Sequence, residues 1–250
     1  MKITAVIPAR YESSRFPGKP LVEINNQPMI EHVYKRVEKT DVIDQVIVAT
    51  DDRRIAEAIK NFGGKVEMTS SDHKSGTDRI AEVAQKINSD IIVNVQGDEP
   101  LIKPVMIEQL VKPFKGNEES LMTTLKKRID DLNEINNPNV VKVVTDDNNF
   151  ALYFSRATIP YQRKDHDGKV DYYKHIGVYA FRRDFLLEYS KMNESRLEKI
   201  ESLEQLRVLE NGYKIKVVET VFDTVGVDTP EDLSYVKELI QSEDIDYRWE

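Results

Sequence analysis

The sequence predicts an α/β fold in which a mostly parallel β-sheet lies between two layers of helices. Strand-like and helix-like patterns alternate through the first hundred residues. The strand-like runs at 3–7, 46–49 and 91–95 are almost continuously apolar, which is typical of strands buried on both faces of a parallel sheet. Because crossovers between parallel strands are right-handed, these elements would form a three-layer sandwich, with the loops after the strands along one edge.

The first half is expected to follow the order βαβαβαβ. Pro28 precedes a helical stripe and suits a first helical position. Gly63 and Gly64 end a second stripe, as a left-handed cap would. In chain order the expected elements are a strand at 3–7, a helix at 29–37, a strand at 46–49, a helix at 55–62, a strand at 65–68, a helix at 80–87 and a strand at 91–95.

The second half has more β character and less regular alternation. Residues 146–149, Asp-Asp-Asn-Asn, predict a hairpin turn. The polar segment 161–171 fits either a plain surface loop or a lid over a site. The expected elements are strands at 121–125, 140–144, 151–154, 175–181 and 214–218, a helix at 200–209 closed by Gly212, and a helix from Pro230 onward.

The composition limits the classes of protein. A chain of 250 residues can bury one good core, either as one domain or as one domain with an insertion. Its formal charge of −8 argues against a general nucleic-acid binder. It contains no cysteine, so a metal would need oxygen or imidazole ligands. No stretch approaches the roughly 18 apolar residues of a membrane span, and no signal-peptide core precedes the first strand, so we expect a cytoplasmic protein without membrane contact.

A cationic loop follows the first strand. It carries Arg10, Arg15 and Lys19. In open α/β sheets, ligands bind at the carboxyl ends of the strands. A triphosphate carries about four charges near neutral pH, so it needs several cations, among which arginine offers forked donors and lysine a point charge. The loop therefore predicts a nucleotide site.

Two aspartates follow strand-like runs at points where a ligand crevice would open. Asp98 comes after Gly97, where the missing side chain lets the backbone approach a ligand, although a turn-forming role is the alternative. Asp228 precedes residues 229–232, Thr-Pro-Glu-Asp, in which Thr229 would cap a helix and leave Asp228 for another role. Mg²⁺ favours a few carboxylates together with phosphate oxygens, which two such aspartates beside a triphosphate would supply.

Ten sequence blocks in a fixed order extend this pattern. They are IPARY (7–11), RFPGKPL (15–21), ATD (49–51), SGTDR (75–79), NVQGDEP (94–100), NPNVVK (137–142), YFSRATIP (153–160), HIGVY (175–179), LEQLR (203–207) and GVDTPED (226–232). In this order they resemble the 3-deoxy-manno-octulosonate cytidylyltransferase family over nearly the whole chain. The basic first loop alone would be a weak signal, because nucleotidyltransferases at large share it.

The resemblance implies an activity and an architecture. CMP would pass from CTP to the anomeric hydroxyl of 3-deoxy-D-manno-octulosonic acid (Kdo), with release of pyrophosphate, for lipopolysaccharide biosynthesis. The fold would be a Rossmann-like nucleotidyltransferase sandwich with an inserted β-rich dimerisation part, assembled as a homodimer. Residues 1–250 would form a single domain, with a nucleotide-binding half at 1–120, a sugar-binding and dimerisation part at 121–225, and a metal-ligand segment with a C-terminal helix at 226–250.

The resemblance also implies the roles of individual residues. The catalytic residues would be Lys19, Asp98 and Asp228, and the two aspartates would bind Mg²⁺. The nucleotide-binding residues would be Arg10, Arg15, Lys19, His73, Ser75, Gly76 and Arg79. The residues around the sugar acid would be Gln96, Arg156, His175, Tyr179, Glu204 and Gln205.

Without the resemblance, the sugar-site residues favour plainer roles. Glu204 and Gln205 lie between two leucines of a predicted helix and would be surface residues. His175 on a strand of mixed polarity would be a structural histidine, and Arg156 would pair with a carboxylate.

Two features stand apart from the family pattern. Asp223 adds a carboxylate close in sequence to the proposed metal ligand Asp228, where it is either harmless or alters the charge of the site. Residues 164–167 do not align with the family pattern. If they contact the far end of the sugar, the family pattern does not determine which exocyclic substituents the sugar carries.

Three other functions are alternatives. A cytidylyltransferase for another acidic sugar, such as a nonulosonic acid or a modified Kdo, would share the phosphate loop. A dinucleotide-binding oxidoreductase is disfavoured because the first loop has one glycine where the motif G-x-G-x-x-G needs three. A Walker phosphate loop is disfavoured as well, because Pro20 follows Lys19. A regulatory module that binds a nucleotide without turnover would not need Asp98 and Asp228 to converge.

Overall fold

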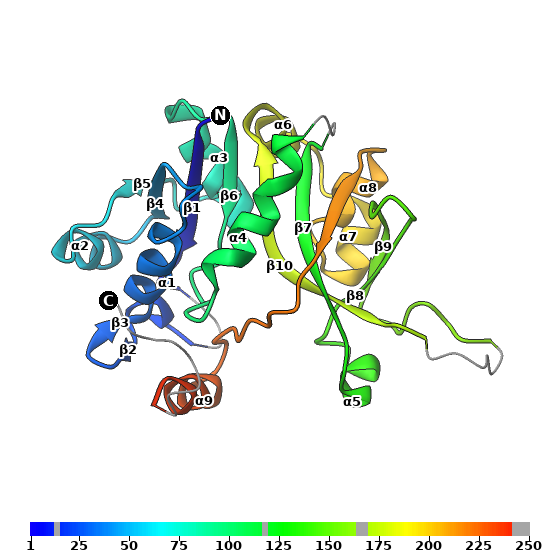
Figure 1. The fold of residues 1–250 in the computed structure, drawn as a ribbon. Coiled ribbons are helices and arrows are strands. Elements are labelled where there is room, and N and C mark those ends of the chain that lie inside the picture. Colours follow the sequence, from blue (N-terminus) through cyan, green and yellow to red (C-terminus); the bar gives the residue numbers. More distant parts are fainter. Residues whose placement is uncertain (13–15, 117–119, 164–169, 242–250) are drawn as a thin grey trace. The chain divides into compact units, whose positions relative to one another are not determined.

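The structure is a computed structural model that describes residues 1–12, 16–116, 120–163 and 170–241. The chain forms two compact units, whose elements are labelled in Figure 1. The first unit combines Met1–Ile107 with Thr224–Glu250, and the second unit is Glu108–Asp223. The second unit is therefore inserted between two stretches of the first.

The first unit contains a parallel sheet in the order β6-β1-β4-β5. Its strands are β1 (Ile3–Ala9), β4 (Gln45–Thr50), β5 (Val66–Met68) and β6 (Ile91–Asn94). In the register of this sheet, Ala5 lies between Val46 and Val93. The parallel sheet predicted for this half is confirmed.

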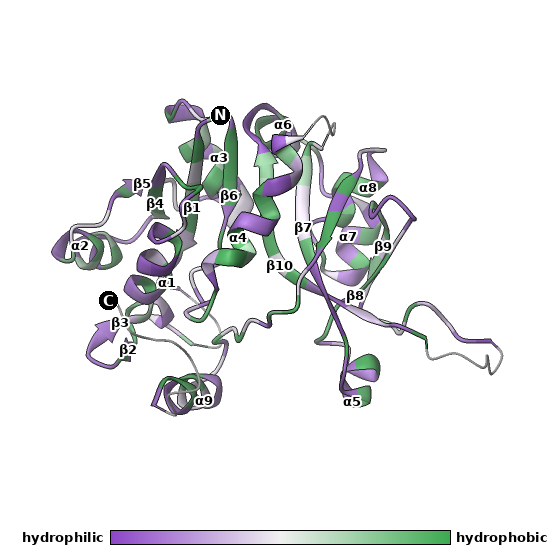
Figure 2. Cartoon of the chain, viewed as in Figure 1, coloured by the Kyte–Doolittle hydropathy of each residue, from purple (hydrophilic) through white to green (hydrophobic). Residues whose placement is uncertain are grey.

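Helices connect these strands. They are α1 (Met29–Glu38), α2 (Arg53–Asn61) and α3 (Gly76–Lys86), and the chain returns to this unit in α9 (Pro230–Gln241). Because β1, β4 and β5 proceed across the sheet in one direction and β6 returns on the far side of β1, right-handed crossovers place α1 and α2 on one face and α3 on the other. Figure 2 shows the apolar colouring of β6 and the two-sided colouring of α1, as this layering requires.

The second unit is built around β7 (Met122–Arg128). This strand pairs in parallel with β11 (Ile215–Glu219) and antiparallel with β10 (Tyr173–Arg182). Strand β8 (Lys142–Thr145) pairs with β10 and forms a hairpin with β9 (Ala151–Ser155). The turn predicted at 146–149 is confirmed, with Asn149 at a φ of 58° and a hydrogen bond from Asp146 N to Phe150 O of 2.9 Å.

The helix predicted at 200–209 is wrong. Two helices, α7 (Arg196–Glu201) and α8 (Leu206–Glu210), take its place. Ser202 breaks the run because it adopts a left-handed φ of 53°, and the apolar spacing continues across the break without revealing it. Gly212, at a φ of 79°, follows the second helix, as expected of a closing glycine.

Several short elements have no counterpart among the predicted ones. They are α4 (Pro104–Val111), α5 (Leu132–Asn136), α6 (Arg183–Tyr189), the 3₁₀ turns η1 (Lys19–Leu21) and η2 (Lys112–Lys115), and the hairpin β2 (Glu23–Ile24) with β3 (Gln27–Pro28). Helix α6 begins directly after β10 with no glycine or proline between them. Among the residues described, no helix is long and apolar enough to cross a membrane.

Candidate active site

Three charged side chains from distant parts of the sequence meet in the first unit. The ammonium Nζ of Lys19 lies 2.6 Å from Asp98 Oδ2 and 3.1 Å from Asp228 Oδ1. Burial alone would lower the pKa of Lys19, but the charges of the two aspartates and their hydrogen bonds raise it above its ordinary value. The catalytic trio implied by the resemblance is therefore gathered at one point, with two carboxylates facing one cation.

Lys19 is placed by a tight turn in the cationic loop. Gly18 adopts a left-handed φ of 72°, and its amide donates to the carbonyl of Tyr11 over 2.8 Å. The Tyr11 ring lies 3.2 Å from the guanidinium carbon of Arg54, a cation–π contact that fixes the start of the loop against α2. Lys19 then opens the turn η1, while Arg15, predicted to hold the nucleotide, lies outside the described residues.

Asp98 is placed by the end of β6 and by the absence of a side chain at Gly97. A Cβ atom at Gly97 would lie 2.9 Å from the carbonyl oxygen of Pro8, the residue before the last one of β1. The carbonyl of Asp98 accepts a hydrogen bond of 2.9 Å from the amide of Val227. The glycine therefore allows the close approach that the sequence predicted, but the group approached is the neighbouring strand.

Asp228 is placed by the start of α9. Asp232 Oδ2 accepts hydrogen bonds from the amides of Asp228 (3.0 Å) and Thr229 (2.9 Å), and Thr229 Oγ1 accepts from the amide of Asp232 (3.2 Å). This is a capping box, so the predicted cap is confirmed and Asp228 keeps its carboxylate for Lys19. Val227, which is fully buried in the core cluster with Ile24, anchors the segment.

Apart from Lys19 and Arg15, the predicted nucleotide-binding residues lie in or against the start of α3. Arg10 donates to the carbonyls of His73 (2.6 Å) and Lys74 (3.3 Å), which ties the cationic loop to this turn. Ser75 caps α3 through a hydrogen bond of 3.1 Å from Asp78 N. A Cβ at Gly76 would lie 3.3 Å from the Pro8 ring.

His73 and Arg79 have protein partners of their own. His73 Nε2 lies 2.6 Å from Glu82 Oε2, and the amide of Ser70, followed by His73 and Lys86, lowers the pKa of Glu82 to about 2. The fully buried guanidinium of Arg79 donates to Asp51 over 3.0 Å and also to Thr69. Arg79 therefore braces the strand ends beneath the site, and its predicted contact with the nucleotide stays a prediction.

Three predicted sugar-site residues meet within the second unit. Tyr179 Oη donates to Gln205 Oε1 over 3.3 Å, and the rings of Tyr179 and His175 lie 5.5 Å apart. His175 Nε2 is also 2.9 Å from Thr124 Oγ1, a neighbour that the sequence did not indicate. Burial lowers the pKa of His175 to about 3, so this imidazole is neutral at physiological pH.

The other predicted sugar-site residues are placed differently. Arg156 donates to the carbonyls of Glu201 (2.7 Å) and Pro138 (3.0 Å), so its guanidinium ties loops of the second unit together. The carbonyl of Glu204 accepts from Tyr189 Oη over 3.0 Å. Gln205 is 3% exposed, so the plainer interpretation of this residue as a surface side chain is wrong. Gln96 belongs to the first unit.

Asp223 has partners in the second unit. Its Oδ2 lies 3.0 Å from Lys127 Nζ and 2.8 Å from Lys174 Nζ. Burial would raise the pKa of Asp223, but the hydrogen bonds and charges of these two lysines lower it. Lys174 also binds Glu134 over 2.9 Å. The carboxylate that stands apart from the family pattern therefore belongs to an ion-pair network, while residues 164–167 lie outside the described residues.

The donor set restricts how a metal ion would be held. No group of three histidine or acidic side chains suited to a metal occurs in the part of the chain that the structure describes. Asp98 and Asp228 offer two carboxylates that already share one cation, the ammonium of Lys19. This pair fits Mg²⁺, which typically takes one or two protein carboxylates and completes its shell with phosphate oxygens and water.

The fold and the site define a nucleotidyltransferase of the cytidylyltransferase class. Residues 4–215 match the family model described as cytidylyltransferase. The chain is 56% identical over 249 residues to the 3-deoxy-manno-octulosonate cytidylyltransferase of Geobacter metallireducens, and the alignment covers 96% of this chain and 98% of that protein. It is 55% identical over 250 residues to the protein of the same name from Geotalea uraniireducens, and this alignment covers 96% of this chain and 100% of that protein.

A solved structure agrees with these relatives. CMP:2-keto-3-deoxy-manno-octonic acid synthetase complexed with CTP superposes with a TM-score of 0.93 at 47% identity, over 97% of this chain and 100% of that one. The chain belongs to the 3-deoxy-manno-octulosonate cytidylyltransferase family. The resemblance identified from the ordered sequence blocks and the nucleotidyltransferase fold that it implied are confirmed.

Proposed function

We infer that this protein transfers CMP from CTP to the anomeric hydroxyl of Kdo, giving CMP-Kdo and pyrophosphate. The observation that carries this function is the convergence of Lys19, Asp98 and Asp228 on one point, in a chain of this family. A module that only bound a nucleotide would have no use for two carboxylates held against one cation.

The reaction is an in-line displacement at the α-phosphorus of CTP. The anomeric oxygen forms a bond to this phosphorus, and the bond from phosphorus to the bridging oxygen of the β-phosphate breaks. Pyrophosphate leaves with the electron pair, and the hydroxyl proton passes to solvent. The protein neutralises charge and aligns the attacking oxygen, since such displacements need little other chemistry from it. Lys19 and Arg10 supply positive charge on the loop after β1.

Asp98 and Asp228 would hold Mg²⁺ when the nucleotide is bound. The ion would polarise the phosphate oxygens and the attacking hydroxyl. Support comes from the Lys19 ammonium, which shows that the two carboxylates approach a single cation. Lys19 would then exchange its aspartate partners for phosphate oxygens, because an ammonium has three donors on a flexible stem.

Side chains of the second unit would bind the sugar acid. Tyr179 and Gln205 already share a hydrogen bond, and both offer groups suited to sugar hydroxyls. Because His175 is neutral, it would act as a hydrogen-bond partner rather than as a charge partner for the sugar carboxylate. Arg156 and Glu204 complete this proposed set.

The protein would act as a cytoplasmic homodimer in lipopolysaccharide biosynthesis. A cytoplasmic reaction suits a nucleotide substrate that is made in that compartment. The dimer is supported by large apolar side chains on the second unit that are exposed in one chain, namely Leu132 (69%), Leu152 (63%) and Ile200 (67%). Light scattering coupled to size-exclusion chromatography tests the dimer by measuring the mass of the wild type and of Leu152→Glu. A dimeric mass is expected for the wild type, and a monomeric mass for the wild type would contradict the proposal.

Pyrophosphate release tests the function. CTP is offered with Mg²⁺ and Kdo, and ATP, GTP or UTP replaces CTP in the controls. Release that requires both CTP and Kdo is the expected result. Release with a nonulosonic acid or a modified Kdo but not with Kdo would keep the chemistry and change the sugar. Release with none of these acids would contradict the proposed function.

A further inference from the structure

A pocket in the second unit has no part in the proposed reaction. Its volume is about 590 Å³, within the range of roughly 300–1,000 Å³ that is usual for small-molecule sites. All the residues that line it belong to Glu108–Asp223, and it includes none of the predicted site residues. The lining residues come mainly from α4, η2, β11 and the β8–β9 turn, and they include Gln109, Lys112, Pro113, Lys216, Val218 and Glu219.

The face of β11 that meets α4 is cationic. Thr123 Oγ1 donates to the carbonyl of Leu110 over 2.7 Å, so the α4 side of the sheet carries Thr123. Lys216 is the register partner of Thr123, and side chains alternate along a strand, so Lys216 and Val218 share this side. Glu219, the register partner of Lys126, lies on the opposite side. On the α4 side the charged lining side chains are therefore lysines.

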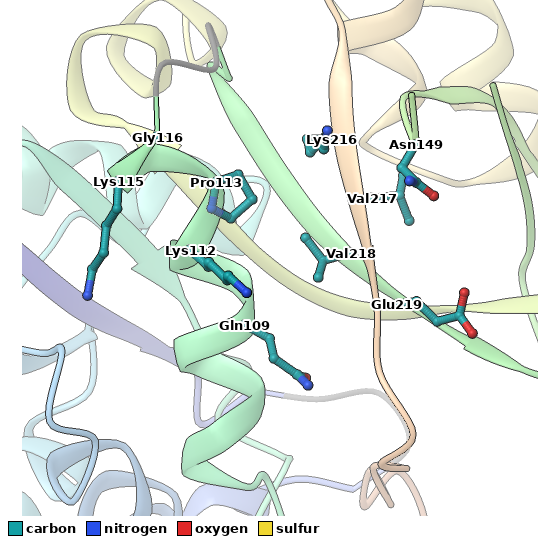
Figure 3. Close-up of a pocket in the computed structure, with 10 residues that line it drawn as sticks. All are labelled: Gln109, Lys112, Pro113, Lys115, Gly116, Asn149, Lys216, Val217, Val218 and Glu219. Atoms are coloured by element: carbon teal, nitrogen blue, oxygen red, sulfur yellow. The ribbon is translucent and has the colours of Figure 1, made fainter. Parts of the chain in front are cut away.

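Figure 3 shows how these side chains are directed. Gln109 and Lys112 point from α4 and η2 toward β11, Val218 points back toward them, and Lys115 points away from β11. Lys112 is exposed and makes no ion pair within the described residues. Lys216 Nζ donates to the carbonyl of Asn148 over 3.0 Å and lies 4.9 Å from the centre of the Phe150 ring, so the ammonium is held beside the β8–β9 turn that lines the pocket.

One polar atom of the pocket needs a partner. Gln109 Oε1 is buried, and among the described residues it has no hydrogen-bond partner. A buried amide oxygen without a partner is uncommon, because the lost hydration is not replaced. If the Gln109 amide turned toward the pocket, a ligand hydroxyl or amino group would satisfy this oxygen.

We propose that this pocket binds a small phosphorylated metabolite. Its phosphate would lie between Lys112 and Lys216, because two ammonium groups match the charge of a phosphate monoester. The net charge of the whole chain is −8, so this positive charge is local to the pocket. The volume exceeds what phosphate alone would fill, so an organic part would lie against Val218 and Pro113 and bond to Gln109. Nucleotides and sugar phosphates both have this chemistry.

Titration calorimetry on the full chain tests the proposal. ADP, glucose 6-phosphate and inorganic phosphate are titrated separately, with EDTA present to remove metal ions. We expect saturable binding of ADP or of glucose 6-phosphate, tighter than that of phosphate, and the better of the two identifies the source. No saturable binding of any probe, or binding of ADP and glucose 6-phosphate no tighter than that of phosphate, would overturn the proposal.

Variants locate the binding. Lys112→Glu should weaken it at least tenfold, and Lys112→Gln and Gln109→Leu should weaken it less. Lys191→Glu, a charge reversal at another exposed lysine of the second unit, should leave it unchanged. Each variant is checked for a wild-type thermal transition. Equal affinity in Lys112→Glu and in the wild type would overturn the assignment, and because CTP turnover is not used, this outcome is separate from a failure of the proposed function.

Discussion

Lys19 Nζ lies 2.6 Å from Asp98 Oδ2, although 79 residues separate the two in sequence. The ammonium also reaches Asp228 and so occupies the place where two carboxylates meet. The structure therefore shows the two negative charges of the site sharing one cation of the protein's own, which balances one of them. A bound metal ion and a bound triphosphate would each take over part of this arrangement.

Asp98→Asn should lower kcat by about 10²–10³-fold and weaken CTP binding only a few-fold, because charge stabilisation matters most in the transition state. Asp228→Asn should behave in the same way. Steady-state pyrophosphate release and CTP titration give the two quantities. Asp41→Asn, at an exposed position, is the matched control and should leave both unchanged. Near-normal turnover of either site variant at saturating Mg²⁺ would remove that residue from the metal site.

Lys19→Ala should weaken CTP binding and slow turnover together, each by about tenfold or more, since the lysine meets the phosphates in the ground state and in the transition state. The same change should strengthen Mn²⁺ binding in the absence of nucleotide, because Asp98 and Asp228 lose the cation between them. Electron paramagnetic resonance of free Mn²⁺ measures this binding. Lys60→Ala on α2 is the control, and unchanged Mn²⁺ affinity in Lys19→Ala would argue against a metal site at the two aspartates.

Gly97→Ala should reduce the free energy of unfolding by about 1–3 kcal/mol, the usual cost of overpacking a tight site. The new Cβ would meet the carbonyl oxygen of Pro8 at 2.9 Å, and a backbone atom cannot swing away as a side chain can. Gly177→Ala is the matched control, because a Cβ there meets nothing within 4 Å. Urea unfolding of both variants measures the difference, and equal stability would show that β1 and β6 separate easily at this end.

The sequence was most informative where its signals are local. The capping box at Thr229 and Asp232 could be recognised from residue types at fixed spacing. The same spacing indicated that the Asp228 side chain takes no part in the cap. The apolar runs of β1 and β6 likewise predicted buried parallel strands. Their pairing order follows from right-handed crossovers.

Long-range contacts explain what the sequence did not reveal. The break between α7 and α8 depends on the left-handed backbone of Ser202, and serine does not mark such a conformation as glycine does. The hydrogen bond between Thr124 and His175 joins neighbouring strands 51 residues apart in sequence. Arg156 and Arg79 matched the family motifs. Only the structure showed that backbone carbonyls hold the Arg156 guanidinium and that Asp51 and Thr69 hold the buried Arg79 guanidinium.

His175 should make the protein less stable as the pH falls below 6.5. Its pKa is about 3 in the folded state and near the ordinary 6.5 in the unfolded chain, so between these values only the unfolded chain binds the proton. The stability associated with neutral His175 is therefore fully present above pH 6.5 and is lost progressively toward pH 3. From pH 6 to pH 5 this group alone should lower the free energy of unfolding by roughly 1 kcal/mol.

Urea unfolding at both pH values should show this loss in the wild type and not in His175→Gln. His32, whose pKa is also lowered by burial, is present in both proteins and cancels in the comparison. Parallel pH dependence in the two proteins would mean that His175 is protonated as readily in the folded state as in the unfolded one.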